Sequence, residues 1–168
     1  VEVEVLTGKP NYPKGNFFQG YGYWSKSVEY WNGIKIRRSN LIPRGSAGGV
    51  RLAINYLSFL GFGSLKAFTI NKKFDAVLVF GTSPVTSCIP AIVYAKKQKI
   101  PLYFWVQDLW PESVSATGMV KNQFLINRLN GLTKWIYKNC DKLLIQSKGF
   151  QQYILNQGVD IKKLIYFF

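Results

Sequence analysis

The sequence has no histidine, only two cysteines and only eight acidic residues among its 168 positions. Without histidine there is no imidazole base and no histidine-ligated metal site. Cys88 and Cys140 show no Cys-x-x-Cys spacing, which excludes a zinc ribbon or a disulfide framework and suits a reducing cytoplasm. The sequence also lacks a P-loop, a His-Glu-x-x-His motif, an Asp-x-Asp motif and a nucleophile elbow.

Positive charge, in contrast, is abundant. The 22 Lys and Arg residues give a formal net charge of +14. Such an excess predicts an anionic partner, namely nucleic acid, anionic lipid headgroups or a phosphate-bearing substrate, and the alternative is a merely solvated basic surface. The basic residues are spread along the chain without a nucleic-acid-binding motif, so we do not expect nucleic acid. A basic nucleic-acid-binding module or a non-enzymatic, membrane-peripheral protein remains the alternative function.

The hydrophobic pattern predicts an α/β fold in a single domain spanning 1–168. Strands are expected at 1–7, 33–38, 74–80, 102–106, 141–146 and from 164 onward, and helices at about 84–98, 121–139 and 147–156. Strand and helix alternate from residue 74, which favours parallel βαβ units in a Rossmann-like, three-layer domain with a mostly parallel sheet. We expect the strand at 33–38 to run antiparallel to the first strand, and Ser83 to cap the helix that Pro84 opens. Both ends begin or stop in strand-like sequence, so we expect a chain truncated at both ends.

Two segments break this regular pattern. Residues 8–33 are rich in glycine, asparagine and aromatic residues, and these aromatics either stack on sugars or bases or pack the loop onto the body. Residues 50–70 are very apolar but interrupted by charge, and predict either a buried crossover helix or a helix that dips into the membrane interface. In the second interpretation four arginines meet lipid phosphates: Arg37, Arg38, Arg44 and Arg51.

We expect the other elements of the chain to be arranged around the stretch from Pro101 to Ser113. Five apolar residues, 102–106, predict a buried parallel strand, and polar residues follow where that strand ends. Ligands of open α/β sheets bind at the carboxyl ends of the strands. If 109–113 turn helically, the carboxylates of Asp108 and Glu112 lie on one side, suited to acid/base work or to binding sugar hydroxyls. The alternative is a structural turn in which Asp108 caps a helix and Glu112 pairs with a cation.

Two further strand ends have the same character. Residues 146–149 open a helix, so that Ser147 either helps to hold an anion or serves as a plain N-cap. Residues 81–83 also follow a predicted strand and precede a predicted helix, and the case for an anion site there is weaker.

Taken together, several motifs resemble glycosyltransferase family 4. They are residues 5–15, 41–45, 55–59, the run Trp105-Val-Gln-Asp-Leu-Trp-Pro-Glu-Ser113, and residues 146–148. The chain is similar to the amino-terminal half of bacterial surface-polysaccharide enzymes that resemble L-fucosamine transferases. The resemblance covers nearly the whole chain.

The resemblance implies the acceptor-side domain of a retaining GT-B enzyme that uses a nucleotide-sugar donor and needs no metal or other cofactor. It places Asp108 and Glu112 as catalytic candidates in an interdomain cleft. Acceptor-binding candidates are Asn11, Tyr12, Gln107, Trp110, Ser147 and Lys148. It further implies a lipid-linked saccharide acceptor, capsule or O-antigen synthesis, and a cytoplasmic, peripheral location on the anionic inner membrane. The expected first strand and donor half are not in this sequence, so we expect the chain alone to be inactive.

Overall fold

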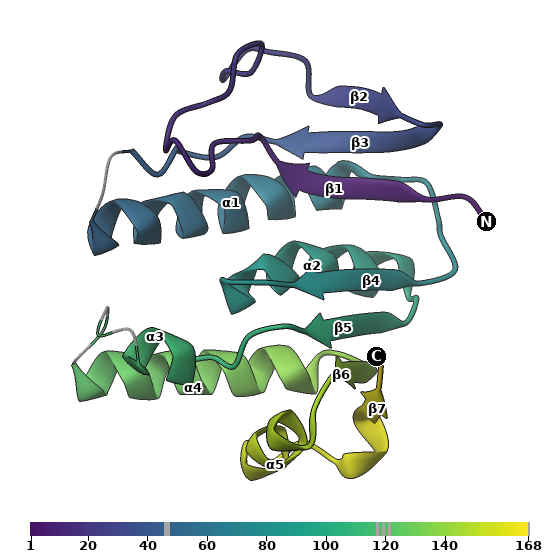
Figure 1. The fold of residues 1–168 in the computed structure, drawn as a ribbon. Helices are drawn as coiled ribbons and strands as arrows, with labels where there is room; N and C mark the ends of the chain where they lie inside the picture. The colour runs from purple at the N-terminus through teal and green to yellow at the C-terminus, as the bar shows by residue number, and fades with distance from the viewer. Residues whose placement is uncertain (46–47, 117, 119, 121, 168) are drawn as a thin grey trace. The chain divides into compact units, whose positions relative to one another are not determined.

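The structure is a computed structural model that describes residues 1–45, 48–116, 118, 120 and 122–167. The chain divides into two compact units, Val1–Ile70 and Asn71–Phe168. The first unit contains one β-sheet and one helix, and the second unit contains a separate β-sheet and several helices (Figure 1).

The first unit is a three-stranded sheet with one long helix. Its strands are β1 (Glu4–Gly8), β2 (Val28–Trp31) and β3 (Ile34–Ser39), in the order β1-β3-β2. Helix α1 (Gly49–Thr69) packs along β1 and β3 (Figure 1). The helix predicted at 50–70 is therefore confirmed.

One sequence-based expectation for this sheet is wrong. The strand expected to run antiparallel to the first, β3, is parallel to β1. Its antiparallel partner is β2, which lies inside the segment interpreted as a loop. Asn32 and Gly33 join these two strands with φ values of 47° and 81°. A two-residue hairpin turn of type I′ requires positive φ at both positions and favours Asn-Gly, so this dipeptide was the signal for β2.

The remainder of the 8–33 segment is held by a buried lysine. The ammonium of Lys9 donates hydrogen bonds to the carbonyls of Gly22, Tyr23 and Ser25. Burial, and then the charge of Lys66, lowers the pKa of Lys9. These bonds tie residues 22–25 to the residue that follows β1, whereas Trp24 itself is fully exposed.

The second unit has an all-parallel sheet in the order β4-β5-β6-β7. The strands are β4 (Val77–Gly81), β5 (Leu102–Val106), β6 (Lys142–Ile145) and β7 (Leu164–Tyr166). Between them lie η1 (Val85–Cys88), α2 (Ile89–Gln98), α3 (Glu112–Ala116), α4 (Gln123–Lys138), α5 (Lys148–Asn156) and η2 (Ile161–Lys163). The predicted α/β alternation with a parallel sheet is confirmed, and the arrangement is compatible with a Rossmann-like domain.

The two faces of this parallel sheet differ in burial. Val79, Phe104 and Leu143 lie side by side in the strand register and are buried. On the opposite face Leu78 and Phe80 of β4 are about three-fifths exposed, at 61% and 59%. The core of the unit therefore sits on one side of β4.

The start of the helix after β4 also differs from expectation. Pro84 has extended backbone, η1 comes before α2, and α2 begins at Ile89 with Pro90 in its first turn. No side chain caps η1, so the prediction of Ser83 as an N-cap is wrong. The Ser83 hydroxyl instead accepts a hydrogen bond from Trp110.

Candidate functional site

Polar residues follow β5 at the point where it leaves the sheet. The amide of Gln107 donates to the carbonyl of Gly81 at 3.1 Å, which extends the pairing of β5 with β4 by one residue. The amide of Ser113 then donates to the carbonyl of Leu109 at 2.9 Å. This bond closes a turn that contains the cis peptide bond between Trp110 and Pro111, and helix α3 begins only at Glu112, so residues 109–111 are not helical.

Trp110 joins three parts of the second unit. Its indole Nε1 lies 3.2 Å from Ser83 Oγ and 3.2 Å from Asp108 Oδ2. Its carbonyl accepts a hydrogen bond of 3.1 Å from the hydroxyl of Tyr153 on α5. Because the indole is also buried, the loops after β4 and β5 and the helix α5 are held in one arrangement.

A buried tyrosine lies near this junction. Tyr137 of α4 is fully buried, and its hydroxyl has no hydrogen-bond partner among the described residues. Burial raises the pKa of Tyr137 strongly, and the neighbouring Tyr153, Cys140 and Asp108 raise it further. The phenol therefore remains protonated and neutral.

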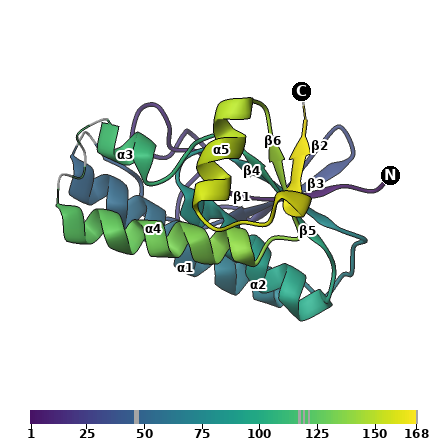
Figure 2. The same ribbon diagram turned by 90° about the horizontal axis from the view of Figure 1, so that it is seen from below.

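A pocket of about 440 Å³ opens beside this junction, among α3, α4 and α5. Figure 2 shows α3 next to the first turns of α4, with α5 close by. The pocket is lined by Pro111, Glu112, Ser115, Ala116, Gln123, Ile126, Asn127, Asn130, Tyr153 and Gln157. Its volume lies within the usual range for small-molecule sites.

The described part of the lining is rich in amides. Among its described residues, Glu112 is the only charged one. The side-chain oxygens of Asn130 and Gln157 are buried without a hydrogen-bond partner in the described structure. Gln123 Nε2 donates to Asn127 Oδ1 at 3.0 Å. The described lining therefore combines one carboxylate with neutral amides, which can both donate and accept hydrogen bonds.

Tyr153 connects the pocket with the Trp110 junction. It is half-buried, and its pKa is raised by burial and then by the charge of Glu112. Its hydroxyl donates to the carbonyl of Trp110, and the phenol oxygen can still accept a hydrogen bond.

The structure distributes the other candidates of this unit as follows. Glu112 lines the pocket, whereas Asp108 is half-buried under the indole of Trp110 and is not part of the described lining. Ser147 accepts the amide of Phe150 at 3.3 Å and is the N-cap of α5, beside the exposed Lys148. Gln107 Nε2 is buried without a described partner.

The acceptor candidates Asn11 and Tyr12 belong to the first unit. Asn11 is buried, donates to the carbonyl of Lys9 at 3.1 Å and accepts the amide of Arg44 at 3.4 Å. Tyr12 is exposed, with the Arg44 guanidinium 5.1 Å from its ring centroid. Asn11 therefore helps to fix its own loop.

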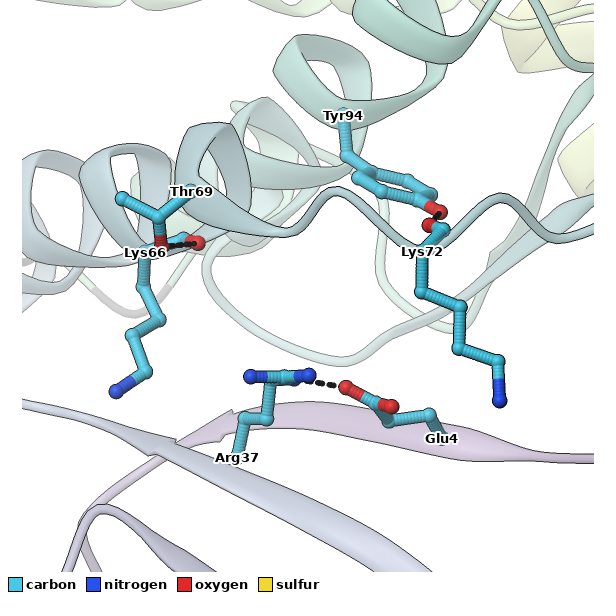
Figure 3. A network of polar contacts seen from close by, with 6 residues as sticks. All are labelled: Glu4, Arg37, Lys66, Thr69, Lys72 and Tyr94. Carbon is cyan, nitrogen blue, oxygen red and sulfur yellow. Dashed lines mark hydrogen bonds and ion pairs between the residues drawn. The ribbon is translucent and has the colours of Figure 1, made fainter.

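The four arginines expected to meet lipid phosphates differ in their surroundings. Arg37 forms an ion pair with Glu4 on the sheet (Figure 3). Arg38 pairs with Glu29, and its Nε lies 2.7 Å from the carboxylate. Arg44 stacks on Tyr12 and Tyr56, whereas Arg51 is exposed at the start of α1.

Sequence reasoning missed the amides of the pocket. Gln123, Asn127 and Asn130 recur at intervals of four and three residues, which places them on one face of α4. This spacing could have been recognised in the sequence. That Gln157 of α5 also lines the pocket depends on tertiary packing, which the sequence does not show.

Comparison with known protein families and with curated proteins finds no match for the chain. Within the described residues, no three His, Cys, Asp or Glu side chains are grouped so that they could hold a metal ion. None of the described helices has both the length and the hydropathy needed to cross a membrane.

Proposed function

We propose that this chain is the acceptor-side part of a retaining glycosyltransferase of the GT-B type, and that the pocket among α3, α4 and α5 receives a sugar unit of the acceptor. One observation carries the proposal. Glu112, from the segment that follows β5, lines a pocket whose other polar groups, among the described residues, are neutral amides and hydroxyls. The sequence resemblance to glycosyltransferase family 4 points to the same residue.

The chemistry of the pocket suits a neutral, hydroxyl-rich ligand. A carboxylate accepts hydrogen bonds from hydroxyls, and amide side chains both donate and accept them. Pro111 and Ile126 supply apolar surface for the C–H face of a sugar ring. With no Lys or Arg in the described lining, the pocket does not favour a phosphate.

In this proposal the two carboxylates have different roles. Glu112 contacts the acceptor hydroxyls directly. Asp108 accepts a hydrogen bond from the indole of Trp110 and so positions the loop after β5. The donor is a nucleotide sugar, and the reaction needs no metal or other cofactor.

The proposed setting is the synthesis of a bacterial capsule or O-antigen. The acceptor is a saccharide linked to a lipid at the anionic inner membrane. The net charge of +14 supports an anionic surface as a partner.

The test is a transfer assay with the longer enzyme that contains this chain, a nucleotide-sugar donor and a lipid-linked acceptor. We expect Glu112→Gln to raise the KM for the acceptor and Asp108→Asn to lower kcat, each by tenfold or more. Asp75→Asn is the matched control, because Asp75 is exposed and forms no described hydrogen bond or ion pair. Equal activity of all three variants would refute the proposal.

A further inference from the structure

Strand β2 lies at the edge of the three-stranded sheet of the first unit. The strand order is β1-β3-β2, so β2 is paired with a neighbouring strand on one side only (Figure 1). On its other side, within the described residues, no strand pairs with it. This open edge follows from the strand order and the hairpin of the first unit by itself. An unpaired strand edge is a template on which a further strand can pair.

The hairpin register shows which backbone groups of β2 are open. The amide of Arg38 donates to the carbonyl of Ser27 at 2.8 Å, which makes these opposed residues a hydrogen-bonded pair. Along an antiparallel ladder such pairs alternate with pairs that exchange no hydrogen bond. Val28 and Tyr30 therefore direct their N–H and C=O groups away from β3. Among the described residues, no hydrogen bond reaches the backbone of either one.

Strand β2 is short but carries none of the residues that usually protect an edge. Its sequence, Val28-Glu-Tyr-Trp31, contains no lysine, arginine or proline. The side chains of Tyr30 and Trp31 are 71% and 63% accessible. Strand-forming residues with an exposed apolar surface and an open backbone edge favour pairing with another strand.

Local charge and symmetry indicate a second copy of the chain as the occupant of this edge. The one charged residue of β2, Glu29, accepts a hydrogen bond of 2.7 Å from the Tyr21 hydroxyl and another of 2.7 Å from Nε of Arg38. Because the guanidinium balances the carboxylate, β2 is locally neutral, and a strand of the same sequence meets no uncompensated charge there.

The spacing of the open residues also suits a two-fold axis. Val28 and Tyr30 are two residues apart, so an axis beside Glu29 places Val28 opposite the partner's Tyr30 and Tyr30 opposite the partner's Val28. Each of these opposed pairs exchanges backbone hydrogen bonds in both directions. All of the open groups of β2 are then satisfied by the same groups of the other copy.

We propose that two copies of the chain pair through β2 in antiparallel orientation and join their three-stranded sheets into one continuous sheet. The contact involves one short strand from each copy, which buries less surface than a standard interface, so the dimer is weak and exchanges rapidly. Pairing about a two-fold axis uses both β2 edges, so assembly through β2 stops at two copies. The net charge of +14 opposes association, and salt that screens this charge strengthens the dimer. This inference rests on the first unit alone and holds whether or not the pocket of the second unit binds a sugar.

The test is sedimentation equilibrium of the chain over a range of protein concentrations, at low and at moderate salt. We expect a monomer–dimer equilibrium whose dissociation constant falls as salt is added. Tyr30→Pro should raise that constant about tenfold, because proline removes an N–H that bonds to the other copy. Proline is tolerated at this position because the lost N–H forms no described bond within the chain. Trp24→Ser is the control for a merely exposed aromatic residue, since Trp24 is fully exposed and lies outside β2, and it should leave the constant unchanged.

Amide hydrogen exchange of the unmodified chain gives a second measurement, which does not depend on how well Tyr30→Pro folds. Exchange at Val28 and Tyr30 should slow as the protein concentration rises, whereas exchange at Trp24 should not change. Four results would each overturn the inference. They are a monomer at every concentration, a dimer that salt dissociates, equal effects of Tyr30→Pro and Trp24→Ser, or exchange at Val28 and Tyr30 that is independent of concentration. Far-ultraviolet circular dichroism and thermal melting verify the fold of both variants.

Discussion

The indole Nε1 of Trp110 lies 3.2 Å from Oδ2 of Asp108, and this contact orients the segment between β5 and α3. The same N–H is 3.2 Å from Ser83 Oγ, so a single donor is shared between two strand ends. The position of Glu112, two residues further on, follows from this arrangement.

Removing the indole N–H should loosen this junction. Trp110→Phe keeps an aromatic ring but leaves Ser83 and Asp108 without their donor. We expect a loss of about 1–2 kcal/mol in the free energy of unfolding, measured by urea denaturation. Trp24→Phe is the control, because Trp24 is fully exposed. Equal urea midpoints for the two variants would show that the shared hydrogen bond does not stabilise the fold.

Gly81 ends β4 where no side chain fits. A Cβ there would lie 1.9 Å from Cε2 of Phe104 and 2.6 Å from the carbonyl oxygen of Trp105. We expect Gly81→Ala to destabilise the second unit by several kcal/mol or to prevent folding, because the overlap involves the buried core and the backbone. In Gly131→Ala on α4 the new Cβ meets nothing within 4 Å, so that variant should be stabilised by up to about 1 kcal/mol. Thermal melting of both variants compares their stabilities with that of the wild type. A Gly81→Ala variant as stable as the wild type would contradict this prediction.

The bond between Tyr21 and Glu29 makes stability depend on pH. The Tyr21 hydroxyl donates to Glu29 Oε2 at 2.7 Å. This bond, and then Arg38, lowers the pKa of Glu29, while the bond to Glu29, and then burial, raises the pKa of Tyr21. The lowered pKa of Glu29 stabilises the fold above pH 4.5, the usual carboxyl value, and this stabilisation is lost as the carboxylate is protonated in acid. The raised pKa of Tyr21 stabilises the fold below pH 10.0, the usual phenol value, and this stabilisation is lost as the phenol ionises in alkali.

Tyr21→Phe tests this dependence directly. The difference in unfolding free energy between the wild type and Tyr21→Phe should be largest near neutral pH. It should shrink both below pH 4 and above pH 10. Urea denaturation across this pH range measures it, and a difference that stays constant with pH would show that the bond is not coupled to either titration.

The two cysteines should be inert in the folded chain. Their sulfur atoms lie 3.9 Å apart and are buried. The hydrogen bond with Cys140, and then burial, raises the pKa of Cys88 well above its usual value, so the nucleophilic thiolate is scarce. We expect a thiol reagent such as 5,5′-dithiobis(2-nitrobenzoate) to label neither residue at pH 8 until denaturant is added. Rapid labelling of the native chain would contradict the buried placement.

Local patterns predicted much of the fold. The parallel strands and the helix over 50–70 followed from apolar runs with clear ends. Of the two roles considered for Ser147, the structure shows the N-cap. The errors arose where pairing partners are distant in sequence. The sequence-based expectation paired β3 with β1 as antiparallel strands, because β2 was hidden in a glycine-rich segment. In the structure β2 is the antiparallel partner of β3, and β3 is parallel to β1.

The site was only partly predictable for the same reason. The scarcity of acidic residues and the polar end of β5 singled out Glu112, and the structure places it in a pocket. Asn130 and Gln157 come from helices separated in sequence, so only packing could bring their unpaired oxygens to that pocket. A charged lysine is normally expected at the surface. Lys9 can be buried because the fold brings three carbonyl acceptors around its ammonium, and the sequence alone does not show that.

The most direct test of the account is a saccharide titration of this chain by saturation-transfer NMR. Galactose, N-acetylglucosamine and lactose are the probes, and inorganic phosphate is the competitor. We predict that a neutral sugar binds, that Glu112→Gln and Asn130→Ala each weaken it about tenfold, and that Asp75→Asn and phosphate leave it unchanged. Binding that survives both pocket variants, or that phosphate displaces, would contradict the assignment of this pocket to a sugar.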